Sequence, residues 1–288
     1  MRPVKFDPAV CVWTGRAILG EGPAWSFTEQ KLYWVDIKAP AIHRFDPTNN
    51  TLNSWPMPEM IGCILEGDDG WFAVAMQSGF AKIKFPAPGT EPVLHPISDP
   101  EFDVPSNRFN DGKRAPDGSI WAGSMDADES SVSGRWWRLD PCGTTSVLNN
   151  KLFGVTNGPA FDVSRNRVYL TDSAAQIIYV GDLVEGGRAA ANLREFLRFA
   201  PSDGFPDGMT IDPFGGLLVA FWDGSCLRRF SPDGHCIQTI KMPVQRPTSV
   251  CFTDDGMTLY VTSASIGLPV GGLDGGLFSL SVCSSAGE

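Results

Sequence analysis

Carboxylate and amide side chains stand just before a glycine at four widely separated places in this chain. Glu21 and Asp207 supply carboxylates, Asn157 supplies an amide, and the neighbours Asn110 and Asp111 supply one of each. Carboxylates that a fold buries side by side cost several kcal/mol unless a partner neutralises them. A hard divalent cation is such a partner, because it prefers carboxylate and amide oxygens. These residues therefore predict a metal site, although any single Asx-Gly pair is also typical of an ordinary turn.

Other reactive sites have little support in the sequence. His43, His95 and His235 occupy unrelated positions, in expected outer strands or turns, and no Gly-x-Ser-x-Gly segment is present. A Ser-His-Asp triad is therefore not expected. The seven cysteines never form a Cys-x-x-Cys pair, which argues against a disulfide framework and a thiolate zinc site. We expect them to be small hydrophobic core residues.

Composition narrows the class of protein further. The net charge of −10 disfavours nucleic acid as a partner, because phosphate binding needs Lys and Arg. No apolar run approaches the roughly 18 residues of a membrane span. The N-terminal residues lack the apolar segment of a secretory signal, so we expect a cytoplasmic protein.

The candidate ligands must be positioned by a repeated β structure. Short β-type runs follow Gly/Asp/Pro turn signals at regular intervals. Six such runs begin at Lys31, Trp71, Ser119, Arg167, Gly216 and Thr258. Their spacing of about 40 to 50 residues is typical of four-stranded propeller blades. Helical periodicity is weak and limited to residues 189–196, and the second unit, near residues 64–70, looks abbreviated.

We therefore predict an all-β, six-bladed β-propeller that forms one domain over residues 1–288. The last unit lacks a fourth strand, and Val10–Trp13 could supply it and close the ring. Because inner strands line the central channel, residues at one repeat phase should converge there. This alignment places Asp111, rather than Asn110, at the channel level. Three aspartates that follow second strands are expected to be turn residues, namely Asp36, Asp172 and Asp223.

Four segments in a fixed order carry a family resemblance. They are Leu19–Pro23, Arg108–Lys113 with Ala122–Met125 after it, Thr156–Pro159 and Pro206–Met209. With these segments nearly the whole chain resembles the senescence-marker protein/gluconolactonase family, the regucalcin-like sugar lactonases. The resemblance implies hydrolysis of a sugar lactone, such as glucono-, xylono- or arabinono-lactone, with one divalent metal ion in the channel.

Metal ligands and substrate contacts also follow from the resemblance. Glu21, Asn157 and Asp207 match the metal ligands, and the ion could be Fe²⁺, Mn²⁺, Zn²⁺, Ca²⁺ or Mg²⁺. Arg108 and Asn110 match positions that meet substrate oxygens.

Two further roles complete the expected site. Asp128 falls where the family has an acidic substrate contact, with Glu129 as the alternative. We expect Asp207 to act as general base as well as ligand, because it is the shortest carboxylate at the channel level. The partner is a small sugar lactone, whose identity depends on loops 126–134 and 267–275; the oligomeric state is not predicted.

Different functions remain open at this point. One alternative is a non-catalytic propeller that binds calcium, another metal or a partner. Another is a related six-bladed esterase, phosphotriesterase or luciferin-regenerating enzyme.

Overall fold

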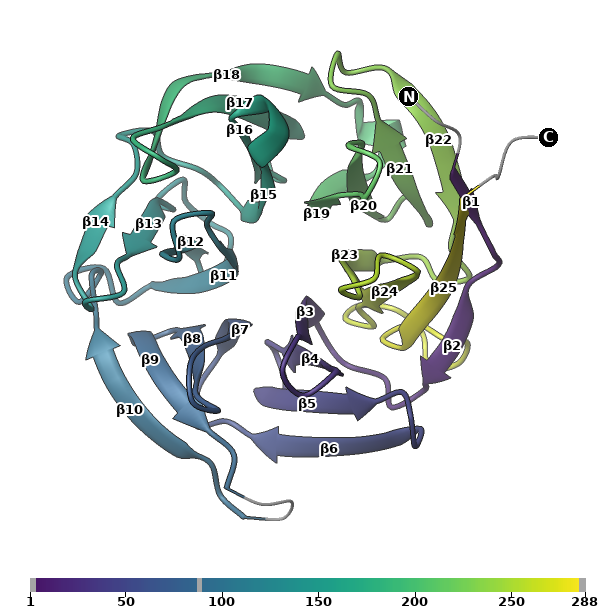
Figure 1. The fold of residues 1–288 in the computed structure, drawn as a ribbon, viewed down its shortest axis with the longest axis horizontal. Helices are drawn as coiled ribbons and strands as arrows, with labels where there is room; N and C mark the ends of the chain where they lie inside the picture. Colours follow the sequence, from purple (N-terminus) through teal and green to yellow (C-terminus); the bar gives the residue numbers. More distant parts are fainter. Residues whose placement is uncertain (1–3, 87–89, 285–288) are drawn as a thin grey trace.

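The computed structural model describes residues 4–86 and 90–284, and their strands form six sheets arranged as a ring (Figure 1). The predicted six-bladed β-propeller is thereby confirmed. The first blade consists of β3 (Gly20–Ser26), β4 (Lys31–Asp36), β5 (Ala41–Asp46) and β6 (Thr51–Pro56). The second consists of β7 (Ile61–Glu66), β8 (Phe72–Met76), β9 (Gly79–Lys84) and β10 (Val93–Ser98). The third consists of β11 (Asn107–Arg114), β12 (Ile120–Asp126), β13 (Trp136–Leu139) and β14 (Thr145–Val147).

The other three blades follow in chain order around the ring. The fourth consists of β15 (Thr156–Asp162), β16 (Arg167–Asp172), β17 (Ile177–Val184) and β18 (Ala189–Arg198). The fifth consists of β19 (Phe205–Ile211), β20 (Leu217–Trp222), β21 (Cys226–Phe230) and β22 (Cys236–Lys241). The sixth consists of β23 (Pro247–Phe252), β24 (Thr258–Ser263) and β25 (Leu277–Ser284) with two N-terminal strands. Every pair of neighbouring strands within a blade is antiparallel, and the first strand of each blade is innermost (Figure 1).

The N-terminus closes the ring, as predicted, but in two pieces. Strand β2 (Val10–Trp13) pairs with β25 around Leu277–Ser279, and β1 (Val4–Phe6) pairs with the end of the same strand. Figure 1 shows both strands along the outer edge of β25. The last blade therefore needs both ends of the chain, which leaves no open gap in the ring of blades.

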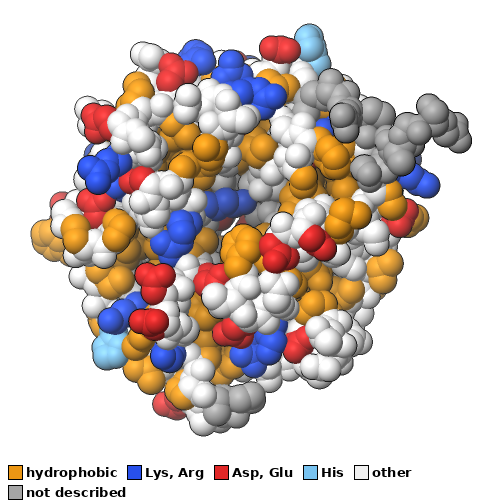
Figure 2. Space-filling model, in the orientation of Figure 1, with side chains coloured by type: hydrophobic (Ala, Val, Ile, Leu, Met, Phe, Trp, Pro, Cys, Tyr) orange, Lys and Arg blue, Asp and Glu red, His pale blue; other side chains and the backbone are white. Residues whose placement is uncertain are grey.

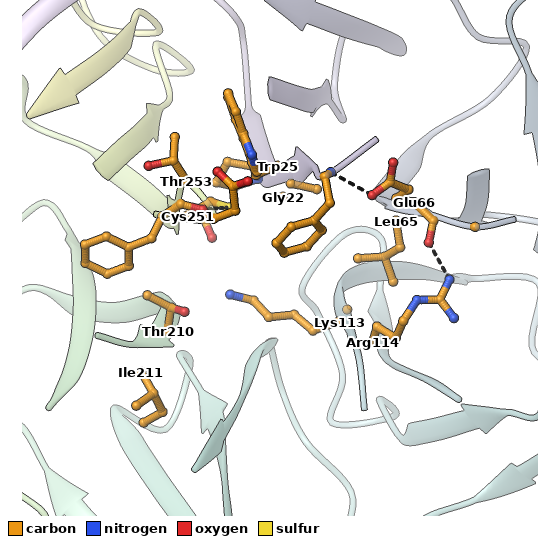
Figure 3. A pocket seen from close by; sticks show the side chains of 18 of the residues that line it. Gly22, Trp25, Leu65, Glu66, Lys113, Arg114, Thr210, Ile211, Cys251 and Thr253 are labelled. Atoms are coloured by element: carbon orange, nitrogen blue, oxygen red, sulfur yellow. Dashed lines mark hydrogen bonds between the residues drawn. The ribbon is translucent and has the colours of Figure 1, made fainter. Parts of the chain in front are cut away.

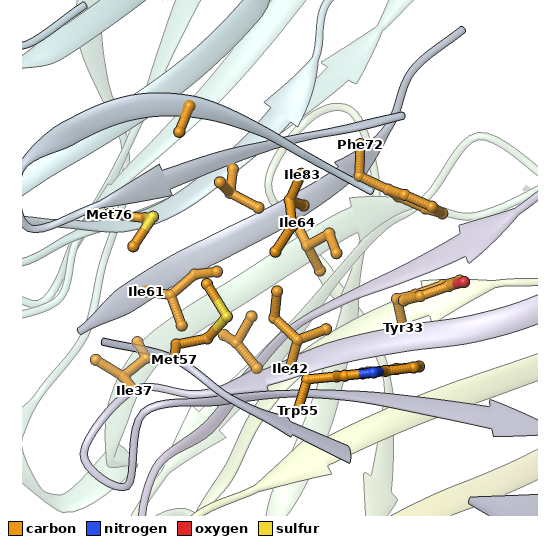
Figure 4. Close-up of a cluster of buried hydrophobic side chains, with 13 residues drawn as sticks. Tyr33, Ile37, Ile42, Trp55, Met57, Ile61, Ile64, Phe72, Met76 and Ile83 are labelled. Atoms are coloured by element: carbon orange, nitrogen blue, oxygen red, sulfur yellow. The ribbon is translucent and has the colours of Figure 1, made fainter. Parts of the chain in front are cut away.

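Alternate side chains of a strand pack against the two neighbouring blades. In β4, Tyr33 and Val35 pack toward the second blade, whereas Leu32 and Trp34 join a cluster with the last blade. Successive side chains of a strand point to opposite faces, so a strand covered on both faces reads as a continuous apolar run. Figure 4 shows the first interface, where Trp55 and its neighbours from blade one meet the second blade.

Three expectations from the sequence were wrong. Residues 189–196 form part of β18, not a helix, because pairing with β17 overrides local helix propensity. The second blade is complete, with four strands. The cysteines are not uniformly core residues: Cys63 and Cys226 are buried, but the exposed ones are Cys142, Cys236 and Cys283.

The expectation for the histidines holds. The histidines lie in outer positions, with His43 in β5, His95 in β10 and His235 in the turn before β22. Within the described ranges, no helix has the length and apolar character to cross a membrane.

Candidate functional site

The six inner strands share an irregularity at the same level of the channel. Each inner strand shifts its register against the second strand at one place, and these places are Glu21/Ala24, Ile61/Cys63, Phe109/Gly112, Asn157/Ala160, Pro206/Met209 and Pro247/Val250. Such bulges bend a strand and re-aim its side chains. The glycines after the polar residues permit close packing, since a Cβ on Gly208 would lie 2.1 Å from the Ser249 hydroxyl oxygen.

The three predicted metal ligands meet at this level. Glu21 on β3, Asn157 on β15 and Asp207 on β19 are all buried, and all line one cavity of about 470 Å³, here called the site cavity. Its other walls come from the N-terminal ends of the inner strands and the loops beside them. The complete lining is Leu19, Glu21, Lys38, Arg108, Asn110, Glu129, Val155, Asn157, Ser173, Ala174, Phe205, Asp207, Trp222 and Ile266.

The oxygens of this trio are only partly satisfied by the protein. Glu21 Oε2 accepts a hydrogen bond from the Gly22 amide at 2.9 Å. Asn157 Nδ2 donates to Ser173 Oγ at 2.9 Å, which turns the amide oxygen of Asn157 the other way. Asp207 Oδ1 is buried and has no hydrogen-bond partner among the described residues. A buried carboxylate oxygen without a donor is the position where a bound cation would fit.

Burial and mutual repulsion dominate the electrostatics of the trio. Burial, then repulsion from Asp111, raises the pKa of Glu21 to about 8. Burial raises the pKa of Asp207 well above its ordinary value, and repulsion from Glu21 and Asp111 adds to this. A divalent cation would relieve both causes, because it makes the ionised form favourable. The set of two carboxylates and one amide therefore suits a hard cation. No group of three or more His, Cys, Asp and Glu side chains that could hold a metal occurs in residues 4–86 and 90–284.

Arg108 and Asn110 lie beside the trio, as predicted. The buried Arg108 guanidinium donates through Nη1 to Asn110 Oδ1 at 2.7 Å, and Asn110 Nδ2 donates to Asn157 Oδ1 at 3.0 Å. Burial lowers the pKa of Arg108 to about 10, and the charges of Glu129 and Glu21 oppose this change. Two proposed substrate contacts and one proposed ligand therefore form a single hydrogen-bonded row.

Asn110 and Asp111 point to different ends of the channel. Asn110 lines the site cavity, whereas Asp111 lines a second cavity of about 1000 Å³ at the C-terminal ends of the inner strands, here called the opposite cavity. Asp111 accepts hydrogen bonds from the amides of Gly112 and Gly158, at 2.7 and 2.9 Å. The position within the repeat predicts Asp111, rather than Asn110, at the level of the proposed metal ligands. The bulge between Phe109 and Gly112 instead lets both side chains reach the channel.

The side chain of Lys113 lies in the opposite cavity. Figure 3 shows Lys113 extending into it, and its Nζ donates to the Met209 carbonyl at 2.6 Å. Burial raises the pKa of Asp111 to about 6, and the positive charge of Lys113 opposes this shift. Figure 2 shows a hollow at the centre of one face of the ring, with basic side chains inside it and acidic ones around it.

Glu129, and not Asp128, reaches the site cavity. Asp128 is exposed, is absent from the cavity lining, and its amide donates to Asp126 Oδ1 at 3.1 Å. Glu129 has a φ of 57°, a left-handed conformation that turns the chain at this point. The structure therefore places the alternative residue, Glu129, where the sequence had assigned Asp128.

Sequence reasoning missed several cavity residues. Ser173 fixes Asn157 by accepting from its Nδ2, and its own hydroxyl donates to the Pro206 carbonyl at 2.6 Å. Lys38 and Trp222 also line the cavity. The available signal was position, since these residues lie next to the aspartates that follow second strands.

All three aspartates lie at turns, as expected. Asp36 Oδ1 accepts hydrogen bonds from the amides of Lys38 and Ala39, and Asp172 Oδ1 accepts one from the amide of Ala175. Asp223 is itself a turn residue with a φ of 57°, and its carboxylate pairs with the guanidinium of Arg246 at 2.7 Å.

Comparison with known proteins gives one consistent family. The family model described as "SMP-30/Gluconolactonase/LRE-like region" matches residues 19–265. The chain is 35% identical to 6-deoxy-6-sulfogluconolactonase of Pseudomonas putida, over 88% of this chain and 86% of the relative. It is 32% identical to pentonolactonase XacC of Haloferax volcanii, over 85% and 81%. A solved structure of a luciferin-regenerating enzyme superposes with a TM-score of 0.87 at 26% identity, over 98% of this chain and 95% of the other.

Proposed function

Because the chain belongs to the SMP-30/gluconolactonase/LRE-like family, we propose that it hydrolyses a sugar lactone to the aldonic acid with the help of one divalent cation. The cation would be held by Glu21, Asn157 and Asp207. One observation carries this proposal: oxygens from three blades meet in a buried cavity, and one of them, Asp207 Oδ1, lacks any donor among the described residues.

The reaction is the opening of a cyclic ester by water. Water adds to the carbonyl carbon, the ring C–O bond breaks, and the leaving alkoxide takes up a proton. When bound, a divalent cation supplies Lewis-acid polarisation of the carbonyl and a more acidic water. Besides holding the cation, the Asp207 carboxylate would accept the proton of the attacking water, and such proton transfer is typically worth about 10²–10⁴-fold.

The row formed by Arg108 and Asn110 would orient the sugar. Both residues line the site cavity, whose volume of about 470 Å³ lies in the range of small-molecule sites. Arg108 is held by Asn110, so its position is fixed before a substrate arrives. Glu129 would accept hydrogen bonds from sugar hydroxyl groups at the cavity mouth.

A pH-indicator assay on chelator-stripped protein tests this function. Glucono-, xylono- and arabinono-lactone are each offered with Mn²⁺, Fe²⁺, Zn²⁺, Ca²⁺ or Mg²⁺. We expect turnover above the spontaneous rate only with added cation. Turnover that is unchanged after chelation would contradict the metal role. Cation binding without turnover of any lactone would favour the non-catalytic alternative.

Asp207 has its own test. Asp207→Asn keeps the shape but removes the base, and we expect a folded protein whose kcat falls by about 10²-fold or more. Asp182→Asn, in an exposed ion pair with Arg194 outside the lining of the site cavity, is the matched control and should keep its activity. Full activity of Asp207→Asn would remove Asp207 from the mechanism.

A further inference from the structure

One wall of the site cavity carries an ammonium group that has no carboxylate partner among residues 4–86 and 90–284. Lys38 follows β4, and its amide donates to Asp36 Oδ1 at 3.2 Å, which fixes the backbone. Its Nζ donates to the carbonyl of Ala127, in the loop after β12, at 3.2 Å. The side chain thus links blade one to blade three, and the rest of its ammonium lies at the half-buried cavity wall. Within the described part of the chain, Lys38 takes part in no ion pair.

With one divalent cation bound, the charges that line the site cavity would sum to one net positive charge, that of Lys38. Glu21 and Asp207 together balance one divalent cation. The negative charge of Glu129 favours the ionised form of Arg108, so these two charges offset each other. Lys38 then contributes one positive charge that nothing in the cavity lining offsets.

We propose that Lys38 selects lactones that carry a second, anionic group, such as a carboxylate, sulfonate or phosphate, at the end remote from the ester. The proposal rests on the lactonase function proposed above. An ammonium is a compact charge with three donors, and Ala127 occupies one of them. The two remaining N–H groups can meet an anion at the cavity wall, where solvent screens the charge less than on an open surface. The hydrogen bond to the Ala127 carbonyl already restrains the side chain, which lowers the entropy cost of ordering it when an anion binds.

Kinetics on two lactones of the same ring test the proposal. D-Glucono-1,5-lactone is neutral, and its 6-phosphate differs only by an anionic group at the far end. We expect kcat/KM to be at least about tenfold higher for the phosphorylated lactone, as a charge-assisted hydrogen bond would give. Lys38→Met keeps the aliphatic stem, and we expect it to lose this preference through KM while neutral-lactone turnover changes less than about twofold.

Two variants separate specificity from general effects. Lys38→Arg keeps the charge and should keep most of the preference. Lys241→Met removes an equal charge at an exposed position of β22, outside the cavity lining, and should change neither reaction. A wild-type enzyme that prefers the neutral lactone, or a Lys38→Met variant that loses both reactions equally, would overturn the proposal.

A binding measurement keeps this inference separate from the proposed function. Calorimetry with cation-loaded protein compares D-gluconate with 6-phospho-D-gluconate, which differ by the same anionic group. Tenfold tighter binding of the phosphorylated acid, with the difference lost in Lys38→Met, would support the role of Lys38. If neither lactone is then hydrolysed, only the proposed lactonase function is rejected. Equal binding of the two acids by wild-type protein would refute the proposed role of Lys38.

Discussion

Removing the divalent cation should make the stability of this protein fall as pH rises. Burial raises the pKa of Glu21 from an ordinary 4.5 to about 8. Between these values the folded, cation-free protein holds a proton that the unfolded chain has released, so folding loses free energy with each step up in pH. Asp207 is shifted in the same direction, and the pKa of Asp111 rises to about 6.

The useful window is pH 6.5 to 8. His43 acts in the opposite direction below it, because burial lowers its pKa from 6.5 to about 4 and the unfolded chain then holds the extra proton. Above pH 6.5 this opposing effect fades, because the unfolded imidazole releases its proton, and the carboxyl effect dominates. One proton over 1.5 pH units, at about 1.4 kcal/mol per unit, gives a loss of about 2 kcal/mol from Glu21. For a chain of this size that loss lowers Tm by about 4 °C.

Thermal unfolding followed by tryptophan fluorescence measures this loss. Chelated protein is compared with cation-saturated protein at pH 6.5, 7, 7.5 and 8. Saturation should flatten the curve, because a bound cation keeps the carboxylates ionised in the folded state. Glu21→Gln should reduce the slope of the chelated protein, since it removes one titrating group and its repulsion on Asp207. A Tm that stays constant from pH 6.5 to 8 without cation, or an equal fall in Glu21→Gln, would refute the reasoning.

Three further outcomes follow from packing and burial. Asp212→Ala removes the buried carboxylate that ion-pairs with the Arg229 guanidinium and should lower the free energy of unfolding by about 3–5 kcal/mol in urea titrations, with unchanged kcat for the folded fraction; a loss below about 1 kcal/mol would contradict this. Gly208→Ala drives a methyl group against Ser249 and should lower the free energy of unfolding by about 1–3 kcal/mol and lower lactone turnover; unchanged turnover would contradict the proposed role of the neighbouring Asp207. Burial raises the pKa of the Cys63 thiol, so a thiol reagent should label it only in denaturant, while the three exposed cysteines react in native protein.

The propeller could be predicted because its signals are repeated six times. A turn, a short β run and a fixed interval recur in every blade, so one weak unit does not spoil the pattern. Strand β18 shows the limit of local reading. It is an outermost strand with several helix-favouring residues, and only its ladder with β17 decides its conformation.

The convergence of Glu21, Asn157 and Asp207 could also be predicted, because equal repeat phase is a geometric property of the ring. The choice between Asn110 and Asp111 could not. Strand alternation sends neighbouring side chains to opposite faces, but a bulge at this level breaks the alternation and lets both reach the channel. No single-sequence pattern marks which residue faces which cavity.

The residues around the ligands follow a different rule, which links the turns to the site. Asp36, Asp126 and Asp172 each end a second strand and accept backbone hydrogen bonds from the loop that follows or packs beside it. Within three residues after these aspartates come the cavity residues Lys38, Glu129 and the pair Ser173–Ala174. One repeat phase thus supplies the proposed ligands on the inner strands, and another fixes the loops that would meet the substrate. Because the loop residues are not among the proposed ligands, a substitution such as Lys38→Met should change the preferred lactone and leave cation binding intact. If both proposals hold, substrate choice in this fold would vary independently of the cation site.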